Sequence, residues 1–353
     1  MNLDKNGLQK KVNEIAAEFG EITLGEMLAG GVVSEIYSAK LETPDGVNRN
    51  IVVKYTKPEI GMNHNFSKTD IENSFSKAPE THNLDVQIQE IITPRNPKIV
   101  KHFPEEKITL MENFNDDGFE LLQNLILEDR LPKSAAKEMG KVLATLKNEL
   151  RDKCSQLKQI EASRTQFDER FYELKALLYN GRMEMFNAIE EEFLNGDGHI
   201  VWTDGDQKNF AVNQDGNVLV FDLGRSVECD PDFMLPNLLG HLALFYLAGY
   251  IDGGIEFFQD VIEAYEKIQD KVDERKFVNY FTASLLHRGM AMRWIDQRIA
   301  DKVGEDSMKN ACMHFGDIVF DKDERVESVD RLFEVLDKVR KLALDGGYRR
   351  KEL

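Results

Sequence analysis

The chain has 353 residues, and its 63 acidic residues outnumber its 45 basic residues, so the net charge is −18 with histidine counted as neutral. At roughly 100–200 residues per domain, this length predicts two domains or one two-lobed unit. The acidic balance argues against broad attachment to nucleic acid or to an anionic membrane, although it is compatible with a local basic pocket.

The cysteines and the apolar runs bear on the compartment of the protein. Cys154, Cys229 and Cys312 are widely spaced and odd in number, which fits neither a disulfide framework nor a paired metal motif, so we expect three reduced thiols. The N-terminal segment lacks the apolar core of a signal peptide, and no run approaches the roughly 18 apolar residues of a membrane span. These features favour a cytoplasmic protein and leave its oligomeric state open.

The first 111 residues carry mainly the patterns of β-strands. Residue types and turn signals predict strands over 21–31, 32–42, 48–57, 98–102 and 107–112. An amphipathic helix is expected over 8–19, and a second helix over 79–92, where Leu84 and Ile88 fall at helical spacing. The polar stretch 61–76 is expected to be a mobile loop.

Helical patterns dominate the rest of the chain. They cover 118–128, 132–152, 166–194, 235–247, 253–269, 273–301 and 324–344. Two short strand-like runs, 209–212 and 218–222, interrupt them. The change of pattern near residues 111–115 predicts an N-terminal domain over 1–111 and a C-terminal domain over 112–353.

Two features of the N-terminal domain suit phosphate binding. Gly30 and Gly31 stand between two predicted strands, and paired glycines let backbone amides approach a phosphate without a side chain in the way. The alternative for them is an ordinary hairpin turn. Lys54 ends the apolar run 51–54, where a compact cation could pair with phosphate oxygens. The alternative is an exposed strand lysine.

Two features of the C-terminal domain suit proton transfer and metal binding. Asp204 and Asn209 lie five residues apart in a polar segment, so the carboxylate could accept a hydroxyl proton while the amide oxygen binds Mg²⁺. Asp222 ends a buried strand-like run just before Gly224, which suits a metal ligand beneath a nucleotide. The alternatives are a polar turn for the first segment and a capping aspartate for Asp222.

Taken in this order, the four features resemble the aminoglycoside phosphotransferase and choline kinase superfamily, the small-molecule relatives of protein kinases. The resemblance covers roughly residues 20–300. It implies an α+β, two-lobed protein-kinase-like fold with a small β-rich N-lobe and a large helical C-lobe. It also implies ATP and Mg²⁺ as cofactors, with Lys54 on the α- and β-phosphates, Asp204 as the catalytic base, and Asn209 and Asp222 as magnesium ligands.

The resemblance implies further roles for residues of the N-lobe. The loop from Gly30 to Ser34 would cover the phosphates. The segment 111–114 is similar to the hinge whose backbone receives adenine, which makes Glu112 and Phe114 cofactor-binding candidates. The helix glutamate that pairs with Lys54 is assigned to Glu80, with Glu90 as its rival.

The chain also departs from the family pattern at two positions. Trp202 stands where the catalytic loop usually begins with histidine, and this histidine is largely a structural support for the loop. Met234 stands where an aspartate often follows the pair Asp230-Pro231.

The predicted function is transfer of the γ-phosphate of ATP to a hydroxyl of a small polar metabolite or an aminoglycoside-like compound, without a nucleic-acid or membrane partner. The segments 111–114 and 286–294 are similar to methylthioribose kinase, which we keep as a subfamily option. Arg288, Arg293 and Trp294 could line an acceptor pocket or could be ordinary helix residues. His241 is expected to be a core histidine. The alternative from another class is a nucleotide-binding pseudokinase that regulates a partner.

Overall fold

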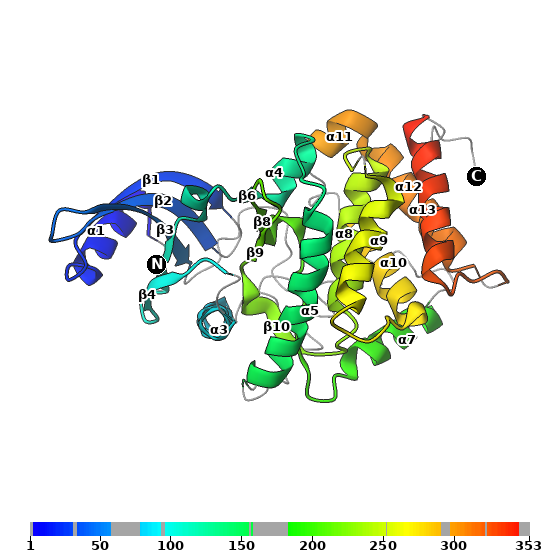
Figure 1. The fold of residues 1–353 in the computed structure, drawn as a ribbon, viewed down its shortest axis with the longest axis horizontal. Coiled ribbons are helices and arrows are strands. Elements are labelled where there is room, and N and C mark those ends of the chain that lie inside the picture. Colours follow the sequence, from blue (N-terminus) through cyan, green and yellow to red (C-terminus); the bar gives the residue numbers. More distant parts are fainter. Residues whose placement is uncertain are drawn as a thin grey trace. The chain divides into compact units, whose positions relative to one another are not determined.

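The computed structural model divides into two compact units (Figure 1). It describes residues 3–30, 34–57, 78–92, 96–154, 157, 183–251, 253–290, 297–321 and 323–345. Unit 1 consists of residues 1–119 and 219–225, and unit 2 consists of residues 120–218 and 226–353. The sequence change near residue 111 thus lies a few residues before the end of the first segment of unit 1. The short return segment of unit 1 contains Asp222.

Unit 1 is built on a five-stranded antiparallel sheet with the order β1-β2-β3-β5-β4. The strands are β1 (Glu21–Gly30), β2 (Ser34–Glu42), β3 (Asn48–Thr56), β4 (Ile99–Phe103) and β5 (Ile108–Glu112). β3 is the central strand, and its residues 51–56 are all buried. In this register Lys54 lies opposite Ile36 on β2 and Thr109 on β5. The sheet therefore holds Lys54 from both sides.

Helix α1 (Lys5–Ile15) bonds to the backbone of β1 through its side chains. The amide group of Gln9 accepts from Leu24 N at 2.7 Å and donates to Ile22 O at 2.5 Å. Asn13 Oδ1 accepts from Ile22 N at 2.8 Å. Apolar residues of the same helix enter the core of unit 1. This core contains Leu8, Val12, Ala16, Ile22, Leu24, Tyr37, Ala39, Leu41, Ile51, Val53, Tyr55, Ile108 and Leu110.

The remaining elements of unit 1 are helical. They are α3 (Ala78–Ile91) and the 3-10 turns η1 (Phe114–Asp117) and η3 (Leu223–Arg225). α3 packs against η3, although more than 130 residues separate them in the sequence. Strand β9 (Val218–Val220) carries the chain to this return segment. The turn η1 is linked to the sheet by a hydrogen bond of 3.1 Å from Asn50 Nδ2 to Asp116 Oδ1.

Unit 2 consists mainly of helices that pack side by side (Figure 1). They are α4 (Leu122–Leu127), α5 (Ala135–Cys154), α7 (Met183–Leu194), α8 (Met234–Leu247), α9 (Gly254–Glu266), α10 (Glu274–Met290), α11 (Gln297–Val303), α12 (Glu305–Val319) and α13 (Val329–Leu344). α8 is buried along its whole length and packs against α10 and α13. Among the short strands, β6 (Glu120–Leu121) pairs with β8 (Phe210–Val212), and β7 (Ile200–Trp202) pairs with β10 (Ser226–Glu228).

A glycine allows the close approach of α8 and α10. A Cβ atom added at Gly240 would lie 2.5 Å from the backbone oxygen of Phe281 and 2.8 Å from Cβ of Ser284. Any larger residue would force the two helices apart, because buried backbone cannot yield as a flexible side chain does. Gly240 therefore fixes the distance at which polar side chains of α8 and α10 meet.

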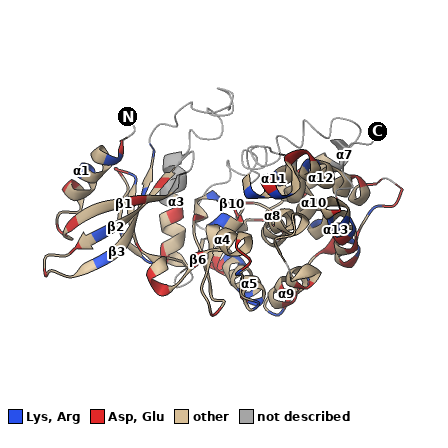
Figure 2. Ribbon diagram, turned by 90° about the horizontal axis from the view of Figure 1, so that it is seen from above, with Lys and Arg blue, Asp and Glu red and all other residues tan. Residues whose placement is uncertain are grey.

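Acidic and basic residues are interspersed on outer helices such as α5 and α13 (Figure 2). Pairs three or four residues apart bring opposite charges together, as in Lys153 with Glu149 on α5 and Lys341 with Asp337 on α13. Exposed pairs of this kind contribute little to stability. Such pairs do not by themselves indicate a binding site.

The structure agrees with the predicted fold class, which combines a β-rich N-terminal region with a large helical C-terminal region. The five predicted strands of the first region and the predicted helix over 79–92 are present. Helix α12 was missed, and the predicted loop 61–76 lies outside the described residues. All three cysteines are free, in agreement with the expected thiols, and all three are buried. Within the described ranges, no helix combines the length and apolar character that a membrane span requires.

The bond between Asn13 and Ile22 gives a first test of the fold. Asn13→Ala would leave the N–H of the fully buried Ile22 without its acceptor, so we expect the free energy of unfolding to fall by roughly 1–3 kcal/mol. Lys10→Ala, at an exposed position of the same helix, should change it by less than about 0.5 kcal/mol. Urea denaturation of both variants measures the difference. Equal losses would show that Asn13 does not hold β1.

Candidate functional site

Lys54 and Asp222 lie together in unit 1. Lys54 Nζ donates to Asp85 Oδ2 at 2.7 Å and to Asp222 Oδ1 at 2.9 Å. Lys54 is buried, so the expected alternative of an exposed strand lysine does not hold. Burial by itself would lower the pKa of the lysine, but the Asp222 and Asp85 carboxylates more than offset it and raise the pKa. Lys54 is thus a permanent cation.

Asp85 connects three separate parts of unit 1. Its Oδ2 accepts from Lys54 on β3, while its Oδ1 accepts from Leu223 N in the return segment at 2.6 Å. Gln89 Nε2, one turn along α3, also donates to Oδ1 at 2.7 Å. Both carboxylate oxygens are therefore hydrogen-bonded, as a buried charge requires. The side chain fixes the backbone directly after Asp222.

Among the side chains that the structure describes on α3, Asp85 is the partner of Lys54, and the rival candidate Glu90 is not. Asp85 and Gln89 lie four residues apart, on the face of α3 that is buried with Leu84 and Ile88. Glu90 lies on an exposed position of the helix. Glu80 belongs to the first turn of α3, and its side chain is outside the described part of the chain. The family pattern pointed to a glutamate, so the shorter aspartate was overlooked.

Asp222 has an uncommon backbone conformation. Its φ is +59°, in the left-handed region that non-glycine residues seldom adopt and that often marks functional sites. β9 ends at Val220, two residues earlier than the sequence suggested. The side chain of Asp222 is 46% exposed, against 3% for Asp85. Of the two carboxylates at Lys54, only that of Asp222 is open to a soluble ligand.

The predicted hinge residues fall into different environments. Phe114 stacks on Phe221, with ring centroids 5.7 Å apart and an angle of 17° between the rings. This contact joins the predicted hinge to the residue before Asp222. Glu112 ends β5, where its N–H donates to Lys98 O at 2.9 Å and its carboxylate is exposed. Glu112 is thus linked to Lys98 twice, through its backbone and through an ion pair of 3.5 Å between its carboxylate and Lys98 Nζ.

The predicted phosphate loop is described only at its two ends. Gly30 pairs with Glu35 as the last residue of β1, and Gly31 lies outside the described residues. Ser34 begins β2, and its hydroxyl lies 3.3 Å from that of Thr56 on β3. The β1–β2 connection therefore has hairpin topology, and its role in binding phosphate stays a prediction.

Asp204 and Asn209 lie together in unit 2. Asn209 Nδ2 donates to Asp204 O at 2.8 Å and to Asp204 Oδ2 at 3.3 Å. The 3-10 turn η2 (Gln207–Asn209) folds the segment so that these bonds can form. Because the amide nitrogen faces Asp204, the amide oxygen is the atom of Asn209 that can ligate a cation. Asp204 is half-buried, whereas Asn209 is buried.

Trp202 lies at the start of this segment, as the last residue of β7. Its side chain is fully buried and packs against Phe210, with ring centroids 5.3 Å apart. Asn237 on α8 supports the next residues by donating to Thr203 O and Gly205 O, each at 3.3 Å. Trp202 thus fills space beneath the segment that carries Asp204.

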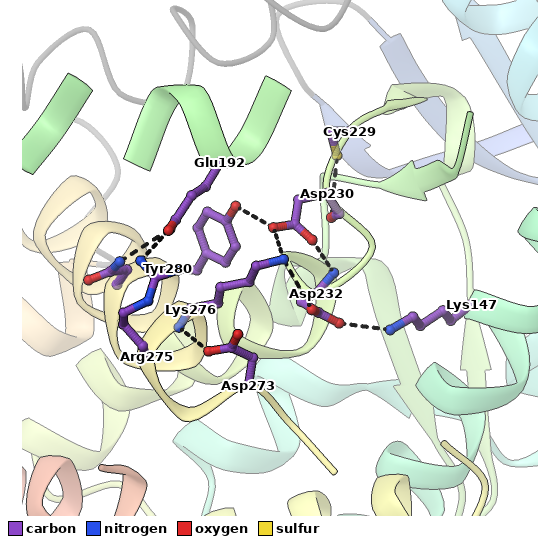
Figure 3. Close-up of polar contacts among 10 residues, drawn as sticks. Lys147, Glu192, Cys229, Asp230, Asp232, Asp273, Arg275, Lys276 and Tyr280 are labelled. Carbon is purple, nitrogen blue, oxygen red and sulfur yellow. Dashed lines mark hydrogen bonds and ion pairs between the residues drawn. The ribbon is translucent and has the colours of Figure 1, made fainter. Parts of the chain in front are cut away.

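A second polar cluster of unit 2 holds the segment that begins at Cys229 (Figure 3). Asp230 is buried and accepts from the Tyr280 hydroxyl at 2.9 Å and from Lys276 Nζ at 2.9 Å, both on α10. Burial and the nearby Asp230 carboxylate raise the pKa of Tyr280, so its hydroxyl remains a donor. Lys276 also reaches Asp232 at 3.5 Å, and Lys147 on α5 contacts Asp232 at 3.0 Å. The cluster anchors this segment to α5 and α10.

The structure therefore brings the predicted site residues together in two pairs. Lys54 and Asp222 form a cationic and anionic pair in unit 1, and Asp204 and Asn209 form a carboxylate and amide pair in unit 2. Within the described residues, no group of three or more His, Cys, Asp or Glu side chains could hold a metal ion. A magnesium site does not require one, because Mg²⁺ is commonly bound by one or two protein ligands and by phosphate oxygens.

Comparisons with known proteins find likeness among solved structures. No protein-family model and no curated protein matches the chain. A choline kinase from Streptococcus pneumoniae is 14% identical, with 96% of this chain and 99% of that one covered and a TM-score of 0.45. A macrolide 2'-phosphotransferase from Brachybacterium faecium is 12% identical, with 98% and 99% covered and a TM-score of 0.47.

An ADP-bound aminoglycoside phosphotransferase, APH(2'')-Ib, is 14% identical, with 97% of this chain and 99% of that one covered and a TM-score of 0.45. These three structures are a choline kinase and two phosphotransferases. Because their identities and TM-scores are low, the chemistry of this chain has to follow from its own residues.

The bonds of Asp85 give a test of unit 1 that does not depend on any ligand. Asp85→Ala would remove one of the two carboxylates at the buried Lys54 and the acceptor for Leu223 N, so we expect a loss of at least about 2 kcal/mol in the free energy of unfolding. Glu90→Ala, on an exposed position of α3, should cost less than about 0.5 kcal/mol. Chemical denaturation compares the two. An Asp85 variant as stable as the Glu90 variant would disprove the connecting role.

Proposed function

We propose that this chain is a phosphotransferase that moves the γ-phosphate of ATP to a hydroxyl of a small polar metabolite or an aminoglycoside-like compound. The observation that carries the proposal is the pairing of Lys54 with Asp222, where a buried permanent cation meets a half-exposed carboxylate on a strained backbone. Phosphoryl transfer is catalysed mainly by positioning and by neutralising charge on phosphate oxygens. A fixed ammonium group and a metal-binding carboxylate supply these two requirements.

The residues present fit a nucleotide with Mg²⁺. Lys54 would bind the α- and β-phosphates as a compact cation. Asp222 offers a carboxylate oxygen and Asn209 an amide oxygen, both of them types that Mg²⁺ prefers. The bound ion would neutralise charge on the phosphate oxygens. Glu112 and Phe114 are proposed to receive the adenine ring through their backbone.

Asp204 is the proposed base. Asn209 Nδ2 contacts its carboxylate, and Asp206 N and Asn209 Nδ2 hold its backbone carbonyl. The residue is half-buried, which leaves part of it open to an acceptor. The acceptor oxygen forms a bond to the γ-phosphorus, and the bond from that phosphorus to the bridging oxygen of ADP breaks. The proton of the acceptor hydroxyl passes to Asp204. Products are ADP and a phosphate monoester.

The short connection after Asp222 favours a small acceptor over a protein. Residues 223–225 form η3 and residues 226–228 form β10, which pairs with β7. Asp230 then follows at a buried position. No room remains between Asp222 and Asp230 for a long loop that could dock a protein substrate. Phosphorylation of proteins without any phosphorylated metabolite would contradict this preference.

The role of Asp222 can be measured by ligand-induced stabilisation. ATP with Mg²⁺ at about 100 times its Kd should stabilise the wild-type chain by about 2.7 kcal/mol, which corresponds to a rise of a few degrees in Tm. Asp222→Ala should lose the part that depends on Mg²⁺, whereas Asp215→Ala, in an exposed turn, should keep it. Thermal unfolding with ATP, with and without Mg²⁺, is the measurement. Undiminished stabilisation of the Asp222 variant would refute the metal assignment.

The role of Asp204 requires an acceptor, which a screen of sugars, amino alcohols and aminoglycosides for ADP release should provide. Because general base catalysis typically contributes about 10²–10⁴-fold, Asp204→Asn should lower turnover by roughly that factor and leave ATP affinity nearly unchanged. Asp197→Asn, an exposed carboxylate before β7, is the matched control. Full turnover of the Asp204 variant would place the base elsewhere. ATP binding without any phosphorylated acceptor would favour the pseudokinase.

A further inference from the structure

A second aspartate, Asp206, lies in the segment that carries Asp204, and it is almost completely buried. Its exposed fraction is 1%. Its carboxylate forms an ion pair with the Nη2 atom of Arg288 on α10. His241 Nδ1 on α8 lies 3.9 Å from the same carboxylate oxygen, and Lys208 Nζ lies 3.7 Å from it. A buried carboxylate is costly unless it is paired, and Arg288 supplies the buried partner.

The pairing resolves the two alternatives for Arg288. Only 8% of this residue is exposed, so it is not an ordinary surface charge of a helix. Its guanidinium contacts a carboxylate of the chain itself, which leaves an acceptor-lining role without support. Arg288 instead connects α10 to the segment 203–209.

The backbone of Asp206 stands between the two predicted site residues. Asp206 N donates to Asp204 O at 2.7 Å, and Asn209 N donates to Asp206 O at 2.8 Å. A side chain that holds Asp206 in place therefore holds Asp204 on one side and Asn209 on the other.

The same two helices hold the segment at a second point. Asn237 on α8 donates to the carbonyls of Thr203 and Gly205, and its Oδ1 accepts from Ser284 Oγ on α10 at 3.0 Å. Ser284 and Arg288 are four residues apart and so lie on one face of α10. The segment is thus fixed at Thr203 and Gly205 by Asn237 and at Asp206 by Arg288.

We propose that Arg288 is a positioning residue, which acts through Asp206 to hold Asp204 and Asn209 in their working arrangement. The proposal rests on the phosphotransferase function. Arg288 touches neither nucleotide nor acceptor in it, so its loss should lower kcat and leave the KM values of both substrates nearly unchanged. A residue that lined the acceptor pocket would instead raise the KM of the acceptor.

The kinetic test uses four variants of the full chain. Arg288→Met should lower kcat by about 10–100-fold, the effect of a small misplacement of a catalytic group. Arg288→Lys, which keeps the charge but not the planar fork, should recover part of this loss. The double variant Asp206→Asn with Arg288→Met buries no unpaired charge, so it should fold and still show the reduced kcat. Arg275→Met, on the same helix and paired with Glu192, should retain full kcat.

Hydrogen exchange provides a readout that needs no turnover. Amide exchange within 203–209, measured by mass spectrometry, should accelerate at least tenfold in Arg288→Met and in the double variant. Exchange in the α5–α9 pair and in the sheet of unit 1 should stay unchanged, whereas a general loss of stability would accelerate all of them.

The outcomes separate the two proposals. Unchanged kcat and unchanged exchange of 203–209 in the double variant would overturn the positioning role of Arg288, and so would a rise confined to the acceptor KM. A wild-type chain that phosphorylates no hydroxyl compound would overturn the phosphotransferase function. In that case accelerated exchange in 203–209 would still show that Arg288 holds the segment, but a catalytic consequence would be refuted.

Discussion

A buried lysine needs negative charge around it, and this requirement organises unit 1. The neighbouring strands β2 and β5 fix the position of Lys54. Its carboxylate partners therefore belong to other elements, which must pack close to β3. Asp85 lies on α3, and Asp222 lies in a segment more than 160 residues further along the chain; both bind Lys54 Nζ. The hydrogen bond from Leu223 N to Asp85 also links α3 directly to the segment that carries Asp222. If Lys54 were apolar, Asp222 would lose this cation, and Asp85 would keep Leu223 N and Gln89 Nε2 as donors but no positive charge beside it.

In unit 2, too, buried polar groups need partners, and side chains from two helices supply them. Polar side chains from the buried helices α8 and α10 reach the segment 203–209, where carbonyl groups and one carboxylate need partners. The close approach of the two helices at Gly240 makes this possible, because it places Asn237 and Ser284 within hydrogen-bonding distance. Apolar packing sets the framework, and the hydrogen bonds select one conformation of the segment within it.

The sequence predicted much of this arrangement, but not all of it. The sheet of unit 1 and most helices follow from local periodicity. Lys54 and Asp222 were singled out at the ends of apolar runs, and Asp204 and Asn209 by their spacing. Asp85 was missed because its partners lie on β3 and in a distant segment, which no local pattern reveals. Its sequence signal was a polar pair, Asp85 and Gln89, on the apolar face of a helix. Asp206 and Arg288 were missed as a pair for the same reason, since 82 residues separate them.

The hydrogen bonds from α1 to β1 have a consequence for how the chain can be shortened. Gln9 and Asn13 occupy backbone groups of Ile22 and Leu24 on the side of β1 where the described part of the chain places no other strand. Without α1, the strand edge would present these groups to any other strand, and such edges promote pairing between molecules. A fragment that begins at Glu21 would therefore retain every predicted site residue, yet it would be prone to self-association by strand addition. By binding these backbone groups, α1 keeps the edge of β1 from pairing with a strand of another molecule.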